Sequence, residues 1–465
     1  MSGRPASRPL RRLAALVGAL AATITAAPPT GLFFVTTGLV SAADPVEASK
    51  LEKCRARLVH SSQVPDVALA AGVRLGGLSD LSAAQGAGRA FCWAITDRGP
   101  NGTIERDGEK LRTLLEPTFT PSLVLLRIDP APDAPATIAV ERILPLTAGT
   151  GKPLTGLPTG GPGHLAVMSA DGSAELAPDP DGVDTEAVAE LPDGTLWIAE
   201  EYGPSLLKVG ADGRVIERHV PVGSGRSAAA VPDRETIPAV YSKRQDNRGF
   251  EAMAAAPDGS RLWVLLQSPL DNPGKKAAKK TGNVRLLGFD PAAGRPVAEH
   301  LYRLGDPTDR NYLTKGAPPD DGKLCAMAML ADGGLLVLEQ DDEGLARLYA
   351  VSLTGVTDTL ARRQSSGDSP TLEEIRDLTE AGIVPAGKRL VADLGPLREA
   401  MTAQADGGRP LHGPLKLEGL AVVDDRHVLV ANDDDFGVHG KKGGRRRSLF
   451  WLVELDHALG AIPSR

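Results

Sequence analysis

The chain has 465 residues, 42% of them hydrophobic and 24% charged, which is ordinary for a folded protein. Its 59 acidic residues outnumber its 52 lysines and arginines, so disorder, a coiled coil and a basic nucleic-acid-binding surface are all poorly supported. Three cysteines exclude a disulfide scaffold and any four-cysteine zinc module. The 52 glycines and 37 prolines indicate many turns, and therefore many short strands rather than long helices.

The N-terminal segment is typical of a signal peptide. Four arginines between residues 4 and 12 precede the apolar run 13–27, and the small residues at 41–43 suit a signal peptidase. Cleavage near Ala26 and an uncleaved anchor are alternatives. We predict a signal peptide at residues 1–43 and a periplasmic or secreted mature chain at residues 44–465. No later stretch could cross a membrane, and an acidic exported chain is a poor partner for nucleic acid. We therefore expect the mature chain to bind neither a membrane nor nucleic acid.

A short pattern recurs along the mature chain. It reads as an acid, a small residue, an apolar residue and alanine, then an Asp-Gly-type turn, then an apolar run that ends in polar residues. Four copies begin at Glu186, Glu251, Cys325 and Glu418, and a weaker copy spans residues 76–97. In the copies that begin at 186, 325 and 418, the polar end follows the leading position by 14 residues. This fixed offset argues for a structural repeat.

Each repeat reads as a meander of short strands. In the clearest copy we expect strands at 185–191, 195–201, 206–209 and 214–220, separated by glycine-containing turns. Four such strands match a propeller blade, and blades close into a ring that protects their edges. We therefore predict an all-β fold in which residues 44–465 form a single β-propeller. Six blades are favoured, with five or seven as alternatives, because a blade between residues 98 and 183 could escape recognition.

The repeat gathers its polar residues on one rim. The first two strands of a blade are antiparallel, so the leading acid and the polar end lie together, opposite the Asp-Gly turn. The residues collected there are Asp97, Arg98, Glu186, Glu200, Glu201, Glu251, Gln267, Glu339, Asp341, Asp342, Glu418, Asn432, Asp433 and Asp435. Because the first strand of a blade is normally innermost, we expect Glu186, Glu251 and Glu418 to converge on the central channel.

Crowded carboxylates repel one another and favour the binding of a cation. Several carboxylate oxygens and an amide match the oxygen shell of Ca²⁺, whereas the lack of recurrent His or Cys disfavours zinc and copper. We therefore predict Ca²⁺ as a cofactor, and its predicted ligands are Glu186, Glu251, Glu418, Asn432 and Asp433. The alternative is that these residues are solvated acids in turns.

Two further groups of rim residues complete the predicted site. A carboxylate crowded by others can have a raised pKa and act as a general base, and the catalytic candidates are Glu200, Glu201 and Asp97. Basic side chains could bind the anionic group of a substrate, and these candidates are Arg98, Arg248 and Lys416. Ion pairing with the neighbouring acids is the alternative for the basic residues. The chain has no G-x-S-x-G elbow, P-loop or H-E-x-x-H motif.

Several short motifs, taken in order, resemble a known family. They are Gly76-Gly-Leu-Ser79, Asp97-Arg-Gly-Pro-Asn101, Asp184-Thr-Glu-Ala187 with Trp197–Pro204, Asn247-Arg-Gly-Phe-Glu251, Gln267-Ser-Pro-Leu270, Lys416-Leu-Glu-Gly419 and Asn432-Asp-Asp-Asp-Phe-Gly437. Across residues 70–455 this order is similar to that of the bacterial phytase-like, or "esterase-like activity of phytase", family. The resemblance implies an exported β-propeller linked to ester or phosphoester hydrolysis. The family usually has asparagine where this chain has Asp434.

These observations together predict an exported, calcium-dependent hydrolase of phosphoesters or carboxylic esters. We expect a monomer that acts on a small anionic substrate at the rim of the central channel. The alternative is a non-catalytic propeller that binds a periplasmic ligand or protein through the same rim.

Overall fold

The computed structural model describes residues 56–461 except 85–90, 107, 132–133, 161–165, 227–228, 306–320, 363–366, 368–369, 409–412 and 439–444. The predicted signal peptide lies outside the described residues. The α-helices of the described part are α3 (Lys275–Thr281) and α4 (Gly395–Ala405). Its 3-10 turns are η1 (Ala70–Gly72), η2 (Ala239–Lys243), η5 (Leu372–Glu374), η6 (Asp435–Gly437) and η7 (Leu459–Ala461). None of the helices in this part is long and apolar enough to cross a membrane.

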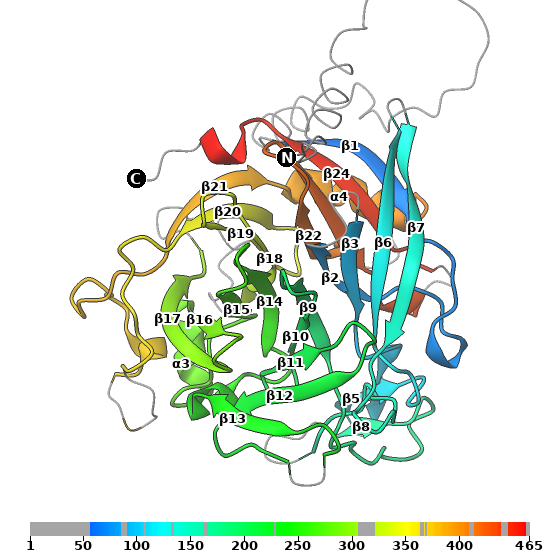
Figure 1. The fold of residues 1–465 in the computed structure, drawn as a ribbon, viewed down its shortest axis with the longest axis horizontal. Coiled ribbons are helices and arrows are strands. Elements are labelled where there is room, and N and C mark those ends of the chain that lie inside the picture. The colour runs from blue at the N-terminus through cyan, green and yellow to red at the C-terminus, as the bar shows by residue number, and fades with distance from the viewer. Residues whose placement is uncertain are drawn as a thin grey trace, which may run out of the picture.

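Large sheets are arranged around a common centre (Figure 1). Blade 1 consists, from the inside outward, of β2 (Leu78–Ala83), β3 (Phe91–Thr96), β6 (Ser122–Ala131) and β7 (Ala134–Pro145). Blade 2 consists of β9 (Thr185–Glu190), β10 (Leu196–Glu200), β11 (Ser205–Val209) and β12 (Val215–Pro221), with β13 (Asp233–Ile237) parallel at its edge. The strands expected between residues 185 and 220 are thus confirmed.

The remaining blades follow the same plan. Blade 3 consists of β14 (Phe250–Ala255), β15 (Leu262–Leu266), β16 (Asn283–Asp290) and β17 (Arg295–Arg303). Blade 4 consists of β18 (Lys323–Met329), β19 (Leu335–Gln340), β20 (Ala346–Ser352) and β21 (Gly387–Asp393). Blade 5 consists of β22 (Lys416–Val422), β23 (His427–Asp433), β24 (Leu449–Leu455) and, from the other end of the chain, β1 (Ala56–Gln63).

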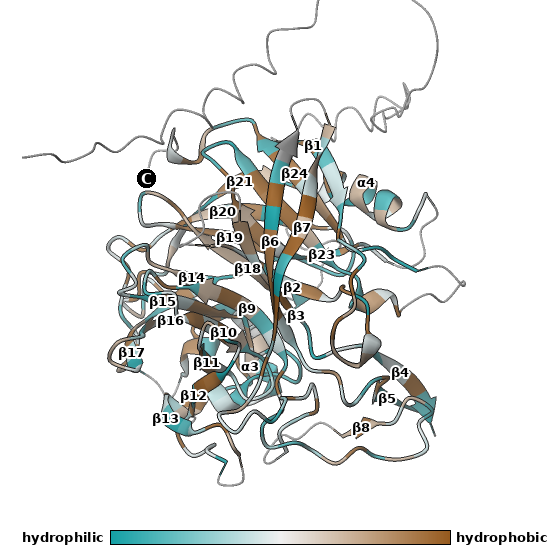
Figure 2. Ribbon diagram, turned by 45° about the vertical axis from the view of Figure 1, so that its right-hand side comes forward, coloured by the Kyte–Doolittle hydropathy of each residue, from teal (hydrophilic) through white to brown (hydrophobic). Residues whose placement is uncertain are grey.

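The innermost strands close a ring, because β2, β9, β14, β18 and β22 each contact the next and β22 contacts β2. The described residues thus form a β-propeller in which five sheets close the ring, which corresponds to one of the alternatives to the six blades favoured from the sequence. Residues 98–183 do not contain an unrecognised blade, because β3 pairs with β6 and so completes blade 1. The intervening hairpin of β4 (Asn101–Arg106) and β5 (Glu109–Leu114) joins β8 (Val167–Met168) in a small separate sheet (Figure 2).

The hydrophobic core is divided among the spaces between neighbouring blades. Ile95 of blade 1 packs in one cluster with Ile198 and Leu207 of blade 2, and Leu81 of blade 1 packs in another with Leu429 of blade 5. Each blade therefore buries both of its faces against its neighbours. This packing fixes the relative positions of the strand ends that carry the polar residues.

Candidate functional site at the channel

Each innermost strand carries a β-bulge at the same place. The register with the second strand of the blade shifts so that one residue has no partner in the ladder. These residues are Ser79, Glu186, Glu251, Cys325 and Glu418. Four of them are the leading positions of the sequence repeat. Ser79 occupies the leading position of the weak first copy, where the sequence has no acid. A bulge re-aims the side chain of the extra residue, which is how these strands present polar groups to the channel.

A second set of side chains comes from the ends of the second strands. The residues at these ends are Asp97, Glu201, Gln267, Gln340 and Asp433. Each lies opposite the position two residues before the bulge, as Asp433 lies opposite Lys416. Successive side chains on a strand point to opposite faces. The side chain of the residue that precedes each of these strand-end residues therefore points into the blade rather than toward the channel.

Three groups of carboxylates result, and within each group the oxygens lie within 4.8 Å of one another. Because Asp97 belongs to two of the groups and Glu186 to two, the groups form one continuous band. The groups are Asp97, Asp433 and Asp435; Asp97, Asp184 and Glu186; and Glu186, Glu201 and Glu251.

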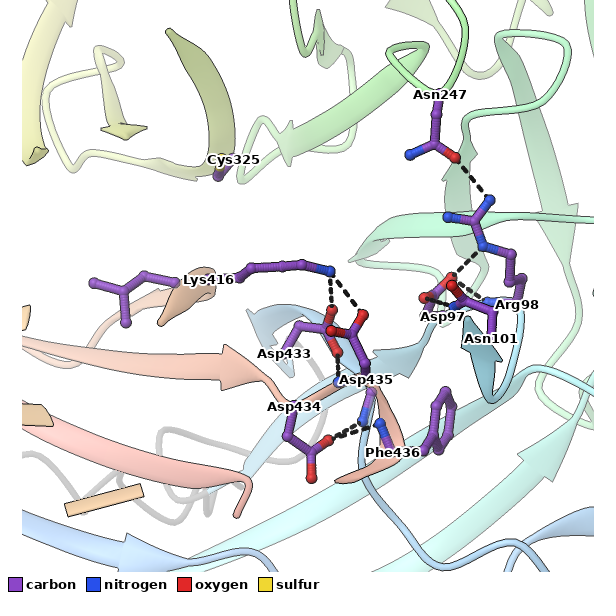
Figure 3. Close-up of polar contacts among 12 residues, drawn as sticks. Asp97, Arg98, Asn101, Asn247, Cys325, Lys416, Asp433, Asp434, Asp435 and Phe436 are labelled. Atoms are coloured by element: carbon purple, nitrogen blue, oxygen red, sulfur yellow. Dashed lines mark hydrogen bonds and ion pairs between the residues drawn. The ribbon is translucent and has the colours of Figure 1, made fainter. Parts of the chain in front are cut away.

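Two of the three groups have an internal counter-ion. The Nη1 atom of Arg98 lies 2.5 Å from Asp184, and its Nε lies 3.5 Å from Asp97. The Nζ atom of Lys416 lies 2.8 Å from Asp433 and 2.8 Å from Asp435. Figure 3 shows the Lys416 ammonium beside Asp433 and Asp435 and the Nε of Arg98 beside Asp97, with Asp434 turned away from Lys416. Arg98 and Lys416 are thus paired with acids, which was the alternative considered from the sequence.

The third group has no such counter-ion. Glu186, Glu201 and Glu251 are 8%, 1% and 3% exposed, and no described lysine or arginine lies within ion-pair distance of them. Neither oxygen of Glu201 accepts a hydrogen bond from a described residue, and neither does Oε2 of Glu251. Burial raises the pKa of all three carboxyls, and repulsion by neighbouring acids raises it further for Glu186 and Glu251. For Glu201, the positive charges of Arg98, Arg244 and Arg112 oppose the rise in pKa.

The paired carboxylates are also perturbed. Burial raises the pKa of Asp97 to about 7 and that of Asp184 to about 6, although Arg98 opposes the shift in both. Burial and then the neighbouring Asp435 raise the pKa of Asp433 to about 8. The site therefore contains acids that exchange protons near neutral pH, which suits a general base.

Two predicted site residues do not belong to this band. Glu200 is fully buried in its blade, where it accepts hydrogen bonds from the Asp184, Tyr202 and Gly203 amides and from Ser205 Oγ. Asn432 accepts from the Leu449 amide and donates to the Arg447 carbonyl. Both side chains point into their blades because each lies one residue before a channel-facing position. The structure therefore does not bring Glu200 or Asn432 together with the three carboxylate groups.

The other predicted residues are distributed unevenly. Glu418 occupies a bulge, and burial followed by Asp433 raises its pKa, but it is not within the three close carboxylate groups. Arg248 comes three residues before the bulge on β14, and its Nη1 donates to Ser268 Oγ at 2.9 Å. Cys325 is a buried free thiol that accepts a hydrogen bond from Gln340, so the ring of bulge residues is not fully acidic.

Asp184 is a site residue that the sequence predictions omitted, and Asp435 was placed on the rim without a role in the site. Asp184 precedes the bulge on β9 by two residues, so it lies on the channel side beside Glu201, whose amide donates to the Asp184 carbonyl. Strand periodicity applied to the quoted motif that begins at Asp184 would have found it. Asp435 lies in η6, a turn whose positive φ angle of 49° sequence patterns do not reveal.

Sequence comparison finds relatives of this chain. A secreted protein of uncharacterised function from the fungus Arthroderma benhamiae is 27% identical over 310 residues, and the match spans 60% of each chain. Among solved structures, an aldose sugar dehydrogenase from Streptomyces coelicolor is 12% identical, with 85% of this chain and 98% of that chain covered and a TM-score of 0.30. A glucose dehydrogenase-like protein from Thermus thermophilus is 12% identical, with 85% and 99% covered and a TM-score of 0.32.

The family assignment has a broader basis than any single relative. Residues 73–436 match the phytase-like family described as "esterase-like activity of phytase". This range runs from the segment before β2 to the η6 turn, so it includes every carboxylate of the three groups. The chain therefore belongs to the phytase-like family, as the order of its motifs predicted.

Proposed function

We propose that this protein is an exported, calcium-dependent hydrolase of phosphoesters or carboxylic esters that acts as a monomer at the channel end of its propeller. The observation that carries the proposal is the group of Glu186, Glu201 and Glu251, which form no ion pair with a described residue, whereas the adjacent groups are paired with Arg98 and Lys416. A buried uncompensated carboxylate is costly, so the folded chain gains free energy by binding a cation there. Membership of the family and the secreted relative support hydrolysis and export.

The donor set favours calcium over transition metals. All three residues offer carboxylate oxygens, and the described groups include no histidine. Hard oxygen ligands suit Ca²⁺, which also takes water and substrate oxygens to complete six to eight ligands. The proposed ligand set therefore keeps Glu186 and Glu251 from the sequence prediction and adds Glu201.

A bound divalent cation would supply a Lewis acid for a phosphoryl or carbonyl oxygen. The protein's own groups supply the rest. Asp97 belongs to both ion-paired groups and lies close to Glu186, and its pKa of about 7 lets it take a proton from water near neutral pH. Arg98 holds Asp184 ionised, and Lys416, whose side chain is 46% exposed, can also reach substrate oxygens from solvent.

The test is a hydrolysis screen of the purified protein with p-nitrophenyl phosphate and p-nitrophenyl acetate, in calcium and in chelator. We expect turnover with calcium, and at least a hundredfold loss in Glu186→Gln, because that substitution removes a ligand next to the proposed base. Glu190→Gln, at the far end of the same strand, is the matched control and should retain activity. Absence of turnover on every ester, with calcium still raising the melting temperature, would favour a non-catalytic binding propeller instead.

A further inference from the structure

Two arginines meet at one amide oxygen beside the carboxylate band. Arg98 Nη1 donates to Asn247 Oδ1 at 2.8 Å, and Arg112 Nη1 donates to the same oxygen at 2.6 Å. Figure 3 shows the Arg98 guanidinium extending from Asp97 toward Asn247. Arg112 comes from β5 of the small sheet, and Asn247 lies in the turn before β14, so three separate parts of the chain converge here.

The second of these cations has no acid of its own. Arg98 is 8% exposed and ion-paired with Asp184, yet its buried Nε has no hydrogen-bond acceptor among the described residues. Arg112 forms no ion pair with a carboxylate in the described part of the chain. Burial followed by the nearby Arg98 lowers its pKa, and the more distant Glu201 and Asp184 oppose this shift. A neutral amide oxygen is thus the shared acceptor of two guanidinium groups, a position where an oxyanion would make stronger, charge-assisted bonds.

A small cavity adjoins this position. Arg98, Arg112, Asn101, Thr113 and Tyr202 contribute to its lining, and it offers about 10 Å³, roughly the space of one water molecule. The Arg98 guanidinium also lies over the Tyr202 ring, 5.7 Å from its centroid. A ligand oxygen that accepts from both arginines would have to take the position of Asn247 Oδ1, so the Asn247 side chain has to turn away. Asn247 is in a turn with a φ of 53°, and no packed strand fixes it.

We propose that Arg98 and Arg112 bind a phosphate group of the substrate. One phosphate oxygen would then take the position that Asn247 Oδ1 occupies between the two guanidinium groups. The inference rests on the proposed function. The phosphate position is separated from the carboxylate groups by the Arg98 side chain alone, because Arg98 contacts both Asp184 and Asn247. Two guanidinium forks match the charge and the oxygens of a phosphate dianion. Arg112 then makes the β4–β5 hairpin a determinant of substrate choice.

The test measures binding of inorganic phosphate by calorimetry, which needs no turnover. We expect Arg112→Gln to weaken phosphate binding by about tenfold to hundredfold, the range for a lost hydrogen bond to a charged group. Arg106→Gln is the matched control on the same hairpin, where Arg106 donates to the Gly172 carbonyl outside the cavity, and it should bind phosphate as the unmodified protein does. Calcium-induced stabilisation should be unchanged in both variants.

A second variant tests the role of Asn247. Aspartate tolerates a positive φ as asparagine does, so Asn247→Asp should place a permanent carboxylate between the arginines, keep the melting temperature and abolish phosphate binding. Phosphate binding by Arg112→Gln equal to that of the unmodified protein would overturn the proposal, as would binding of acetate in preference to phosphate. If phosphate binding depends on Arg112 but no ester is hydrolysed, the phosphate site is supported and only the proposed hydrolytic function is refuted.

Discussion

Replacing Glu201 with glutamine gives the sharpest test of the metal site. Glu201 is buried and its two oxygens accept no hydrogen bond from a described residue. The adjacent residue, Glu200, is equally buried but accepts four hydrogen bonds. The same chemical change at neighbouring positions should therefore have opposite effects on the stability of the metal-free protein.

The magnitudes follow from the contacts. Burial disfavours the ionised form of Glu201, and glutamine has the same shape without the charge, so Glu201→Gln should stabilise the metal-free protein by about 1–3 kcal/mol at pH 8. With an unfolding entropy of about 2.1 cal/mol/K per residue over about 400 residues, each kcal/mol corresponds to roughly 1 °C. Glu200→Gln replaces an acceptor of the Gly203 and Ser205 bonds with a donor, which should destabilise the protein by about 2–4 kcal/mol.

The assay is thermal unfolding of the three proteins in chelator and in calcium. Calcium at about 100 times its Kd adds about 2.7 kcal/mol, or roughly 3 °C, to a protein that binds it in the folded state alone. The unmodified protein and Glu200→Gln should both show this increase, and Glu201→Gln should lose it. A full calcium response in Glu201→Gln would refute the reasoning, because the unpaired oxygens would then have no part in binding the ion.

Two further predictions concern pH and packing. The pKa values of about 6, 7 and 8 for Asp184, Asp97 and Asp433 exceed the ordinary value of about 3.9, so these groups stabilise the folded state most at low pH. In chelator the melting temperature should therefore fall as the pH rises from about 5 to 8, and a rise over that range would contradict the shifts. Gly249→Ala would place a Cβ 2.2 Å from the Glu201 carbonyl oxygen and should destabilise the protein by about 1–3 kcal/mol in chemical unfolding. Gly203→Ala, whose Cβ meets nothing within 4 Å, is the control and should change stability little.

Asp434 illustrates a departure from the family pattern that the structure accommodates. Its Oδ1 accepts the Gly77 amide at 2.7 Å and the Phe436 amide at 3.1 Å, which joins blade 5 to blade 1. An asparagine carbonyl could accept the same two bonds. The side chain is turned away from the Lys416 ion pairs, so its extra charge does not enter the carboxylate groups (Figure 3).

The sequence by itself determined the repeat, the strands of its clearest copy and the rim on which polar residues gather. These features are local, because alternation, turn residues and fixed offsets are all encoded within about 15 residues. The same local pattern indicated Glu186 and Glu251 as channel residues, since each leads a copy whose first strand is innermost. It also gave the family, through the order of motifs that now lie around one channel.

Tertiary structure decided the number of blades and the choice between adjacent polar residues. Residues 98–183 carry strands whose partners, β3 and β8, cannot be identified from local sequence, so a hairpin insertion resembled room for another blade. Glu200 and Glu201 have the same chemistry and differ in which face of the sheet they occupy, which the pairing of β9 with β10 fixes. The meeting of Arg98, Arg112 and Asn247 likewise depends on packing between segments about 150 residues apart.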